Sequence, residues 1–162
     1  MTSTNTGTIL DVIIEPLVFH HDDRGWLAEL FRQDELDEHK LPVMAYVSAT
    51  NPGMTRGPHE HRYQTDLFVF CGPGDLELHL WDARHDSVTF GTKIVLTVGA
   101  SNPCRVIVPP GVVHGYQNIS DLPALVFNAP NRLFAGRNRS EEVDEIRHEN
   151  DSDSPYSFNN TP

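Results

Sequence analysis

The chain has 162 residues, the length of one domain that buries a hydrophobic core without disulfide or metal cross-links. It carries 12 basic and 23 acidic residues, and this charge of −11 argues against a nucleic-acid groove, which needs clustered Lys and Arg. No apolar run approaches the length that spans a bilayer, and the first ten residues lack the pattern of a secretion signal. We therefore expect a cytoplasmic protein with neither nucleic-acid nor membrane partners.

Short hydrophobic runs, rich in Val, Ile, Leu and Phe, alternate with turn residues at near-regular spacing. This pattern predicts an all-β sandwich or barrel. The turns carry recognised chemistry, such as Asn51-Pro52-Gly53 and Gly72-Pro73-Gly74. The expected strands, in chain order, cover residues 9–14, 26–32, 43–50, 56–61, 66–71, 76–81, 93–98, 104–108, 112–118 and 124–128.

In the strand expected over 76–81, leucines alternate with Glu, His and Trp, so one face is apolar and the other is mixed. His79 lies on the mixed face, where it either lines a pocket or faces solvent, and solvent is the more common position. The two cysteines, Cys71 and Cys104, are interpreted as buried free thiols, as expected in the cytoplasm.

From Arg132 onward the chain is polar and acidic, and residues 140–143, Ser-Glu-Glu-Val, offer a weak capped start for a helix. We see no second domain and no internal repeat. The prediction is one domain over 1–162, with a barrel over about 8–130 and an irregular or weakly helical extension over 131–162.

The most informative segment is Arg-Gly-Pro-His-Glu-His over 56–61. Residues two apart in a strand project to the same face, so His59 and His61 point into one space, with Asp66 close behind. Further on, a rigid Pro-Pro-Gly turn leads into a strand that carries His114. By themselves, two histidines on one strand are a weak indication of a functional site.

These two segments resemble the paired motifs of the cupin superfamily. Pro-x-Gly-x-x-His-x-x-x-Asn is matched in full by residues 109–118, whereas His-x-His is followed by Asp66 where the metal-binding pattern has glutamate. The resemblance implies a small jelly-roll β-barrel with all three histidines in its mouth, which is a usual place for a ligand. An enclosed cluster of three imidazoles has few purely structural uses, so the histidines are expected to form a functional pocket.

Further segments resemble the dTDP-4-dehydrorhamnose 3,5-epimerases over most of the chain. They are residues 23–29, the Arg-Gly-x-His of 56–59, residues 82–91 and residues 108–116. The resemblance implies an isomerase in which a base removes the proton beside the 4-keto group of a nucleotide-linked 6-deoxysugar. An acid then returns a proton to the opposite face, and no cofactor is required.

The same resemblance implies roles for individual residues. His59 is the base, and His61 and His114 complete the catalytic pocket. A homodimer is expected, paired through early strands such as 9–14. The residues expected to bind the substrate are Arg24, Glu29, Arg56 and Tyr116.

The chain departs from the family at two points. Asp66 stands where the family has a lysine that supports the enolate, and a carboxylate opposes negative charge. Phe127 lies where the proton-returning tyrosine is expected, and phenylalanine has no proton to donate. The tyrosines weighed as substitutes are Tyr63 and Tyr116, and the aspartates weighed as the partner of the histidine are Asp151 and Asp153.

Three alternatives remain open from the sequence. Arg-Gly-x-His-x-His is also similar to sugar 3,4-ketoisomerases, which use two histidines to shuttle protons. His59, His61, Asp66 and His114 also form a set suited to a divalent transition metal, in a cupin of isomerase or dioxygenase type. The third alternative is a sugar-binding cupin without catalytic activity.

Overall fold

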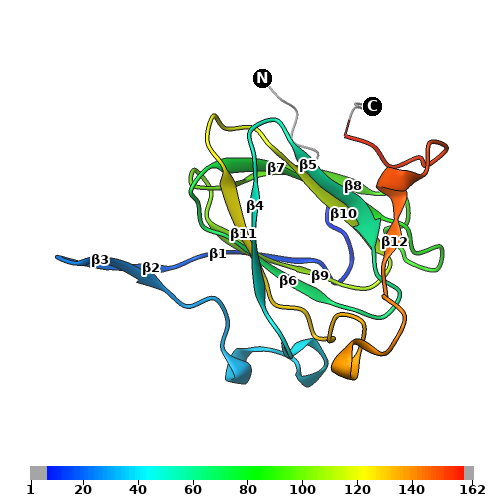
Figure 1. The fold of residues 1–162 in the computed structure, drawn as a ribbon, viewed down its shortest axis with the longest axis horizontal. Helices are drawn as coiled ribbons and strands as arrows, with labels where there is room; N and C mark the ends of the chain where they lie inside the picture. Colours follow the sequence, from blue (N-terminus) through cyan, green and yellow to red (C-terminus); the bar gives the residue numbers. More distant parts are fainter. Residues whose placement is uncertain (1–6, 159–162) are drawn as a thin grey trace.

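The computed structural model describes residues 7–158, so both ends of the expected domain, 1–6 and 159–162, lie outside the described residues. Two five-stranded antiparallel sheets and a separate hairpin make up the fold (Figure 1). The first sheet has the order β1 (Ile13–Pro16), β9 (Cys104–Val108), β6 (Asp66–Phe70), β11 (Ala124–Asn128) and β4 (Tyr46–Thr50). The second has the order β12 (Ile146–Arg147), β5 (Thr55–Glu60), β10 (Val112–Asn118), β7 (Asp75–Asp82) and β8 (Lys93–Gly99).

The hairpin consists of β2 (Phe19–Asp22) and β3 (Gly25–Ala28). Helical structure within 7–158 is confined to four three-residue 3-10 turns, and none of these helices is long and apolar enough to cross a membrane. The all-β jelly-roll prediction is therefore confirmed. The 3-10 turns are η1 (Gln33–Glu35), η2 (Glu38–Lys40), η3 (Arg137–Arg139) and η4 (His148–Asn150).

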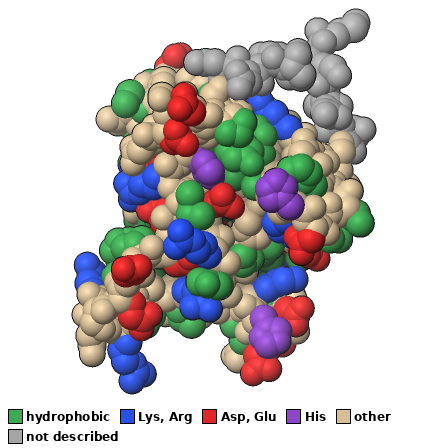
Figure 2. All heavy atoms as spheres, turned by 90° about the vertical axis from the view of Figure 1, so that its right-hand side faces the viewer, with side chains coloured by type: hydrophobic (Ala, Val, Ile, Leu, Met, Phe, Trp, Pro, Cys, Tyr) green, Lys and Arg blue, Asp and Glu red, His purple; other side chains and the backbone are tan. Residues whose placement is uncertain are grey.

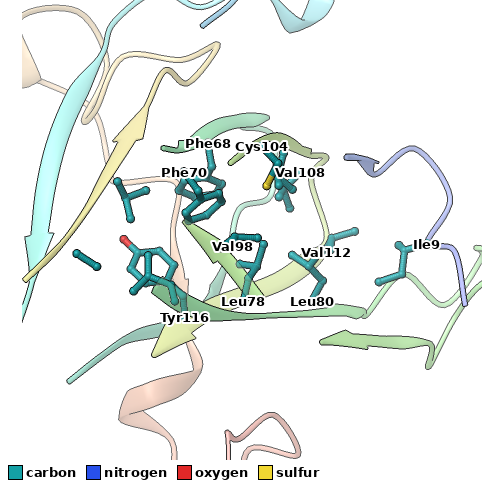
Figure 3. Close-up of a cluster of buried hydrophobic side chains, with 14 residues drawn as sticks. Ile9, Phe68, Phe70, Leu78, Leu80, Val98, Cys104, Val108, Val112 and Tyr116 are labelled. Carbon is teal, nitrogen blue, oxygen red and sulfur yellow. The ribbon is translucent and has the colours of Figure 1, made fainter. Parts of the chain in front are cut away.

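The hydrophobic core lies between the two sheets, because alternate side chains of facing strands point inward (Figure 3). The three leucines of β7 are fully buried there, as their alternation predicts. They meet Val98 of β8 and the aromatic rings of β6, Phe68 and Phe70. Tyr116 lies at one end of this cluster, so the core adjoins the region that carries the histidines.

The outer face of the second sheet is covered by the C-terminal segment. Phe158 packs against His79 and Trp81, with ring centroids 5.1 and 6.4 Å apart. His79 is consequently only 2% exposed, so the prediction that it faces solvent was wrong, and it is not among the residues that line the main cavity. This polar face is buried because a later part of the chain docks on it.

The early strands differ from the prediction. The first strand is displaced to Ile13–Pro16, and the strand expected over 26–32 is shorter and forms a hairpin with β2, which the prediction missed. A turn at residues 22–25 explains the hairpin, since the Asp22 carboxylate accepts a hydrogen bond from the backbone N–H of Arg24 at 2.8 Å.

No helix forms over 140–143 in the described chain, so that prediction was wrong. The 3-10 turn η3 lies just before these residues, and the segment after them forms the short strand β12, which pairs with β5. Backbone pairing with a sheet edge outweighs the weak local helix signal. Figure 2 shows the face that carries this segment, on which acidic, basic and hydrophobic side chains are interspersed.

The β2–β3 hairpin projects away from the two sheets (Figure 1). Trp26 and Leu27 are 55% and 61% exposed on it, although both are large and apolar. Large apolar side chains presented together on a projecting element are a frequent feature of protein interfaces.

Candidate active site

Two of the histidines come from neighbouring strands of the second sheet, and His61 directly follows the end of β5. His59 on β5 and His114 on β10 are direct register partners. Gly57 makes their close approach possible, because it has a φ of +76° and a Cβ atom there would lie 2.7 Å from the backbone oxygen of His114. Any other residue at this position would push β5 away from β10.

The three imidazoles form one cluster, as the cupin resemblance implied. The ring centroid of His59 lies 4.4 Å from that of His114 and 5.6 Å from that of His61. His61 and His114 are 5.9 Å apart. His114 is buried, whereas His59 and His61 are partly buried and border the main cavity.

Asp66, at the start of β6, connects this cluster to the opposite sheet and is only 1% exposed. Its Oδ2 lies 3.2 Å from Nε2 of His61 and 3.4 Å from Nε2 of His114. Neither contact has the alignment of a regular hydrogen bond, so the attraction is mainly electrostatic. Its Oδ1 accepts hydrogen bonds from the amides of Gln64 and Asn128, at 2.9 and 2.8 Å.

Asp66 and His61 shift each other's pKa in opposite directions. Burial raises the pKa of Asp66, but its contacts with His114 and His61 outweigh burial and hold that pKa well below the usual range. Burial lowers the pKa of His61, but the neighbouring Asp66 carboxylate more than offsets this and raises it overall. His61 and Asp66 therefore form an imidazolium–carboxylate pair.

The pKa of His59 is shifted downward, in contrast to that of His61. Burial, together with the positive charge of His114 and His61 when they are protonated, lowers the pKa of His59 to about 2. Its nearest carboxylate oxygen, Oε1 of Glu145, lies 3.8 Å from Nε2. A neutral imidazole at the cavity wall has the protonation state that a general base requires.

Two acids of the C-terminal segment, Asp144 and Glu145, complete the surroundings of the histidines. The Asp144 carboxylate accepts hydrogen bonds from the backbone N–H groups of residues 62–64, at 2.9–3.0 Å. Its backbone oxygen contacts Nδ1 of His61. The sequence analysis missed both residues, and the aspartates it weighed instead, Asp151 and Asp153, are exposed and lie outside the cavity lining.

A cavity of about 930 Å³ opens beside the cluster and is lined by both sheets and the C-terminal segment. This volume is at the upper end of ordinary ligand sites. Arg56 lines it and is held by Oγ1 of Thr50 and the backbone oxygen of Ala49, at 3.0 and 2.8 Å. The exposed arginines among the other lining residues are Arg132, Arg137, Arg139 and Arg147.

The four residues expected to bind the substrate fall into two groups. Arg56 and Tyr116 line the cavity. Arg24 and Glu29 lie outside its lining, on and just after the projecting hairpin. Arg24 is 90% exposed at its side chain and pairs with Asp22, so within one chain these two groups do not meet.

The four candidate metal ligands fit an ion poorly as they stand. Oδ2 of Asp66 and Nε2 of His114 are buried without a regular hydrogen-bond partner, which favours a cation. In His61, however, Nδ1 contacts the Asp144 backbone oxygen, and Nε2 of Gln64 lies 3.0 Å from its Nε2, in the space that a metal ion would need. A site that uses all four residues would have to displace Gln64.

Comparisons with known proteins agree on one family. The family model described as dTDP-4-dehydrorhamnose 3,5-epimerase matches residues 6–143. A probable low-salt glycan biosynthesis epimerase, Agl13, of Haloferax volcanii is 37% identical over 136 residues, covering 83% of this chain and 86% of its own. The spore coat polysaccharide biosynthesis protein SpsL of Bacillus subtilis is 39% identical over 116 residues, covering 71% and 75%.

The fold is also that of solved structures. The crystal structure of a dTDP sugar isomerase from Desulfovibrio desulfuricans G20 superposes with a TM-score of 0.79 and 23% identity, covering 92% of this chain and 91% of that one.

Proposed function

Because the chain belongs to the dTDP-4-dehydrorhamnose 3,5-epimerase family, we propose that it epimerises a dTDP-linked 4-keto-6-deoxyhexose, with His59 as the base. It is an isomerase-class enzyme, as the sequence predicted. The observation that carries the proposed role of His59 is its neutral, partly buried imidazole at the wall of a cavity large enough for a nucleotide-linked sugar.

The first step moves one proton. Nε2 or Nδ1 of His59 takes the proton from the carbon beside the keto group, and the electrons of that C–H bond form the enolate. Electrostatic stabilisation of such an oxyanion is commonly a large part of catalysis. His61, kept positively charged by Asp66, provides a cation in the same cavity wall. Asp66 thus acts through His61 and does not itself meet the enolate.

Epimerases of this family act without a cofactor, and the metal alternative is not favoured. Arg56 offers its guanidinium to the diphosphate or nucleotide, since a planar fork of donors suits phosphate oxygens. Tyr116 lines the cavity near it, as the register pair Tyr116–Arg56 of β10 and β5 indicates.

The projecting hairpin supports a homodimer. β1 occupies one edge of the first sheet, and Trp26 and Leu27 are exposed on the hairpin that follows it. In the dimer we propose, the hairpin of one protomer carries Arg24 and Glu29 to the cavity of its partner. The free thiols of Cys71 and Cys104 support the cytoplasm as the compartment.

We expect Trp26→Ser to convert a dimer into a monomer in light scattering at about micromolar concentration, because the apolar contact is lost. Arg24→Ala should keep the dimer and raise KM by about tenfold, through loss of one charged contact. Val88→Ser, another exposed apolar position outside the hairpin, is the matched control. A wild-type monomer peak, or an unchanged KM in Arg24→Ala, contradicts this assembly.

The proposed function is tested by proton NMR of dTDP-4-keto-6-deoxyglucose in D₂O. The wild-type enzyme should replace the proton at C3, C5 or both by deuterium and form an epimer, with the same rate in the presence of EDTA. Binding without exchange would show a sugar-binding barrel, and a 3-keto product would show a ketoisomerase. Loss of activity in EDTA that added metal restores would establish the metal alternative.

A further inference from the structure

A tyrosine that no sequence motif indicated lies in the cavity wall. Tyr46 is the first residue of β4, at the edge of the first sheet, and lines the same cavity as His59. His59 belongs to β5 in the second sheet, so the two side chains come from different sheets (Figure 1). Inversion at carbon requires an acid and a base on opposite faces of the sugar, and two walls of one cavity provide such an arrangement.

The hydroxyl of Tyr46 is held in place by a hydrogen bond that leaves its proton free to be donated. Tyr46 and Asn128 are register partners on β4 and β11, and the Asn128 amide donates to the Tyr46 oxygen at 2.9 Å. Asn128 is itself tied to Oδ1 of the buried Asp66 at 2.8 Å. Because the oxygen of Tyr46 accepts this bond, its own proton is available to a group in the cavity.

The other tyrosines considered for this role are placed less well. Tyr116 is 5% exposed and packs against the rings of Phe68 and Phe70, with centroids 6.4 and 6.1 Å away. Tyr63 is 64% exposed, contacts Arg132 and lies outside the cavity lining. Tyr46 is 47% exposed, which leaves its ring accessible from the cavity.

We propose that Tyr46 is the catalytic acid that returns the proton to the sugar, in place of the tyrosine that Phe127 replaces. Phe127 directly precedes Asn128, so the hydroxyl comes from the neighbouring strand instead of from β11 itself. This inference rests on the proposed epimerase function.

The step balances in atoms and charge. The O–H bond of Tyr46 breaks, a C–H bond forms on the face opposite His59, and the enolate returns to the ketone. The enzyme is left with a tyrosinate and a protonated His59, and one proton passes between them through solvent to restore the starting state. Burial raises the pKa of Tyr46 to about 12, so the hydroxyl stays protonated between turnovers. An enolate carbon is more basic than a phenolate, so the transfer is favourable.

The test separates proton removal from proton return. In D₂O, the Tyr46→Phe variant should still incorporate deuterium into the starting sugar at a rate within about tenfold of wild type. His59 exchanges the proton that it has removed with solvent and returns a deuteron to the same face. Formation of the epimer should fall by about 100-fold or more. Tyr63→Phe is the matched control and should behave as wild type.

A second variant carries 3-fluorotyrosine at position 46, which retains the hydroxyl but makes it more acidic. At about pH 6, where His61 keeps its proton, the ratio of epimer formation to deuterium exchange should rise above the wild-type value, because a more acidic donor returns its proton faster, and a structural role would leave this ratio unchanged. Epimer formation at the wild-type rate in Tyr46→Phe, loss of deuterium exchange together with epimer formation, or an unchanged ratio of epimer formation to exchange in the 3-fluorotyrosine variant would each overturn the assignment to Tyr46. A wild-type enzyme that exchanges no deuterium would overturn the epimerase function itself.

Discussion

Replacing His59 by asparagine is expected to lower kcat by about 10³-fold and to abolish deuterium exchange into the substrate, because general-base catalysis contributes on this scale. Asparagine keeps a polar group of similar reach but has no basic nitrogen. The measurement is NMR in D₂O with dTDP-4-keto-6-deoxyglucose, alongside calorimetric binding of dTDP, which should change little. His85→Asn, at an exposed histidine outside the cavity, is the control. Exchange at the wild-type rate in the His59 variant would transfer the role of base to another group.

The same histidine sets a distinctive pH profile. His61, His114, Asp66 and Glu145 surround His59. Burial and the charges of the two histidines lower the pKa of His59 to about 2, although Asp66 opposes this shift. His59 is therefore already deprotonated at about pH 5, and kcat/KM should show no acid limb near the ordinary histidine pKa of about 6.5. On the alkaline side, activity should decline as His61 loses the proton that Asp66 stabilises.

Replacing Asp66 by asparagine is expected to lower the free energy of unfolding by about 3–5 kcal/mol at about pH 5.5, as breaking a buried charged pair commonly does. The folded-state pKa of Asp66 is depressed, so its contribution is present above about pH 4 and is lost as pH falls through the folded value. The folded-state pKa of His61 is raised, so its contribution is full below about pH 6.5, the unfolded-state value, and is lost as pH rises through the higher folded-state pKa. The effect of the substitution is therefore largest between these limits.

Urea unfolding at about pH 5.5 and pH 8.5 measures this difference. Asp82→Asn is the matched control, because Asp82 is also buried but its side-chain partners, Arg84, Ser87 and Thr89, do not titrate in this range. Its destabilisation should be similar at both pH values, whereas that of Asp66→Asn should decrease at the higher one. An equal effect of Asp66→Asn at both values would show that its charge is not coupled to His61.

Short-range patterns in the sequence predicted the fold and the centre of the site. The two-residue period of an extended chain predicts that His59 and His61 lie together, and they do, although β5 ends at Glu60; the Pro-Pro-Gly turn starts β10, where His114 pairs with His59. The family resemblance predicted the jelly roll and the isomerase class, and both are confirmed. The roles assigned to individual residues stay predictions.

Long-range docking was not predictable from local patterns. His79 is buried because Phe158 packs on it from 79 positions further along the chain, and no local feature of β7 reveals that contact. In the sequence, Asp144 is one acid among many in a polar segment. In the structure, its carboxylate accepts hydrogen bonds from three backbone N–H groups of the turn after His61. Tyr46 was missed for a related reason, since its pairing with Asn128 depends on which strands become neighbours in the sheet.

The late position of Asp144 in the chain affects the order in which the parts of the site form during synthesis. The β-strands that enclose the core are complete by Asn128, but the turn at residues 62–64 has its carboxylate partner only some 80 positions later. During synthesis on the ribosome, a barrel with its three imidazoles therefore emerges before the segment that fixes them. The proposed catalytic site is therefore completed last, when Ile146 and Arg147 pair with β5.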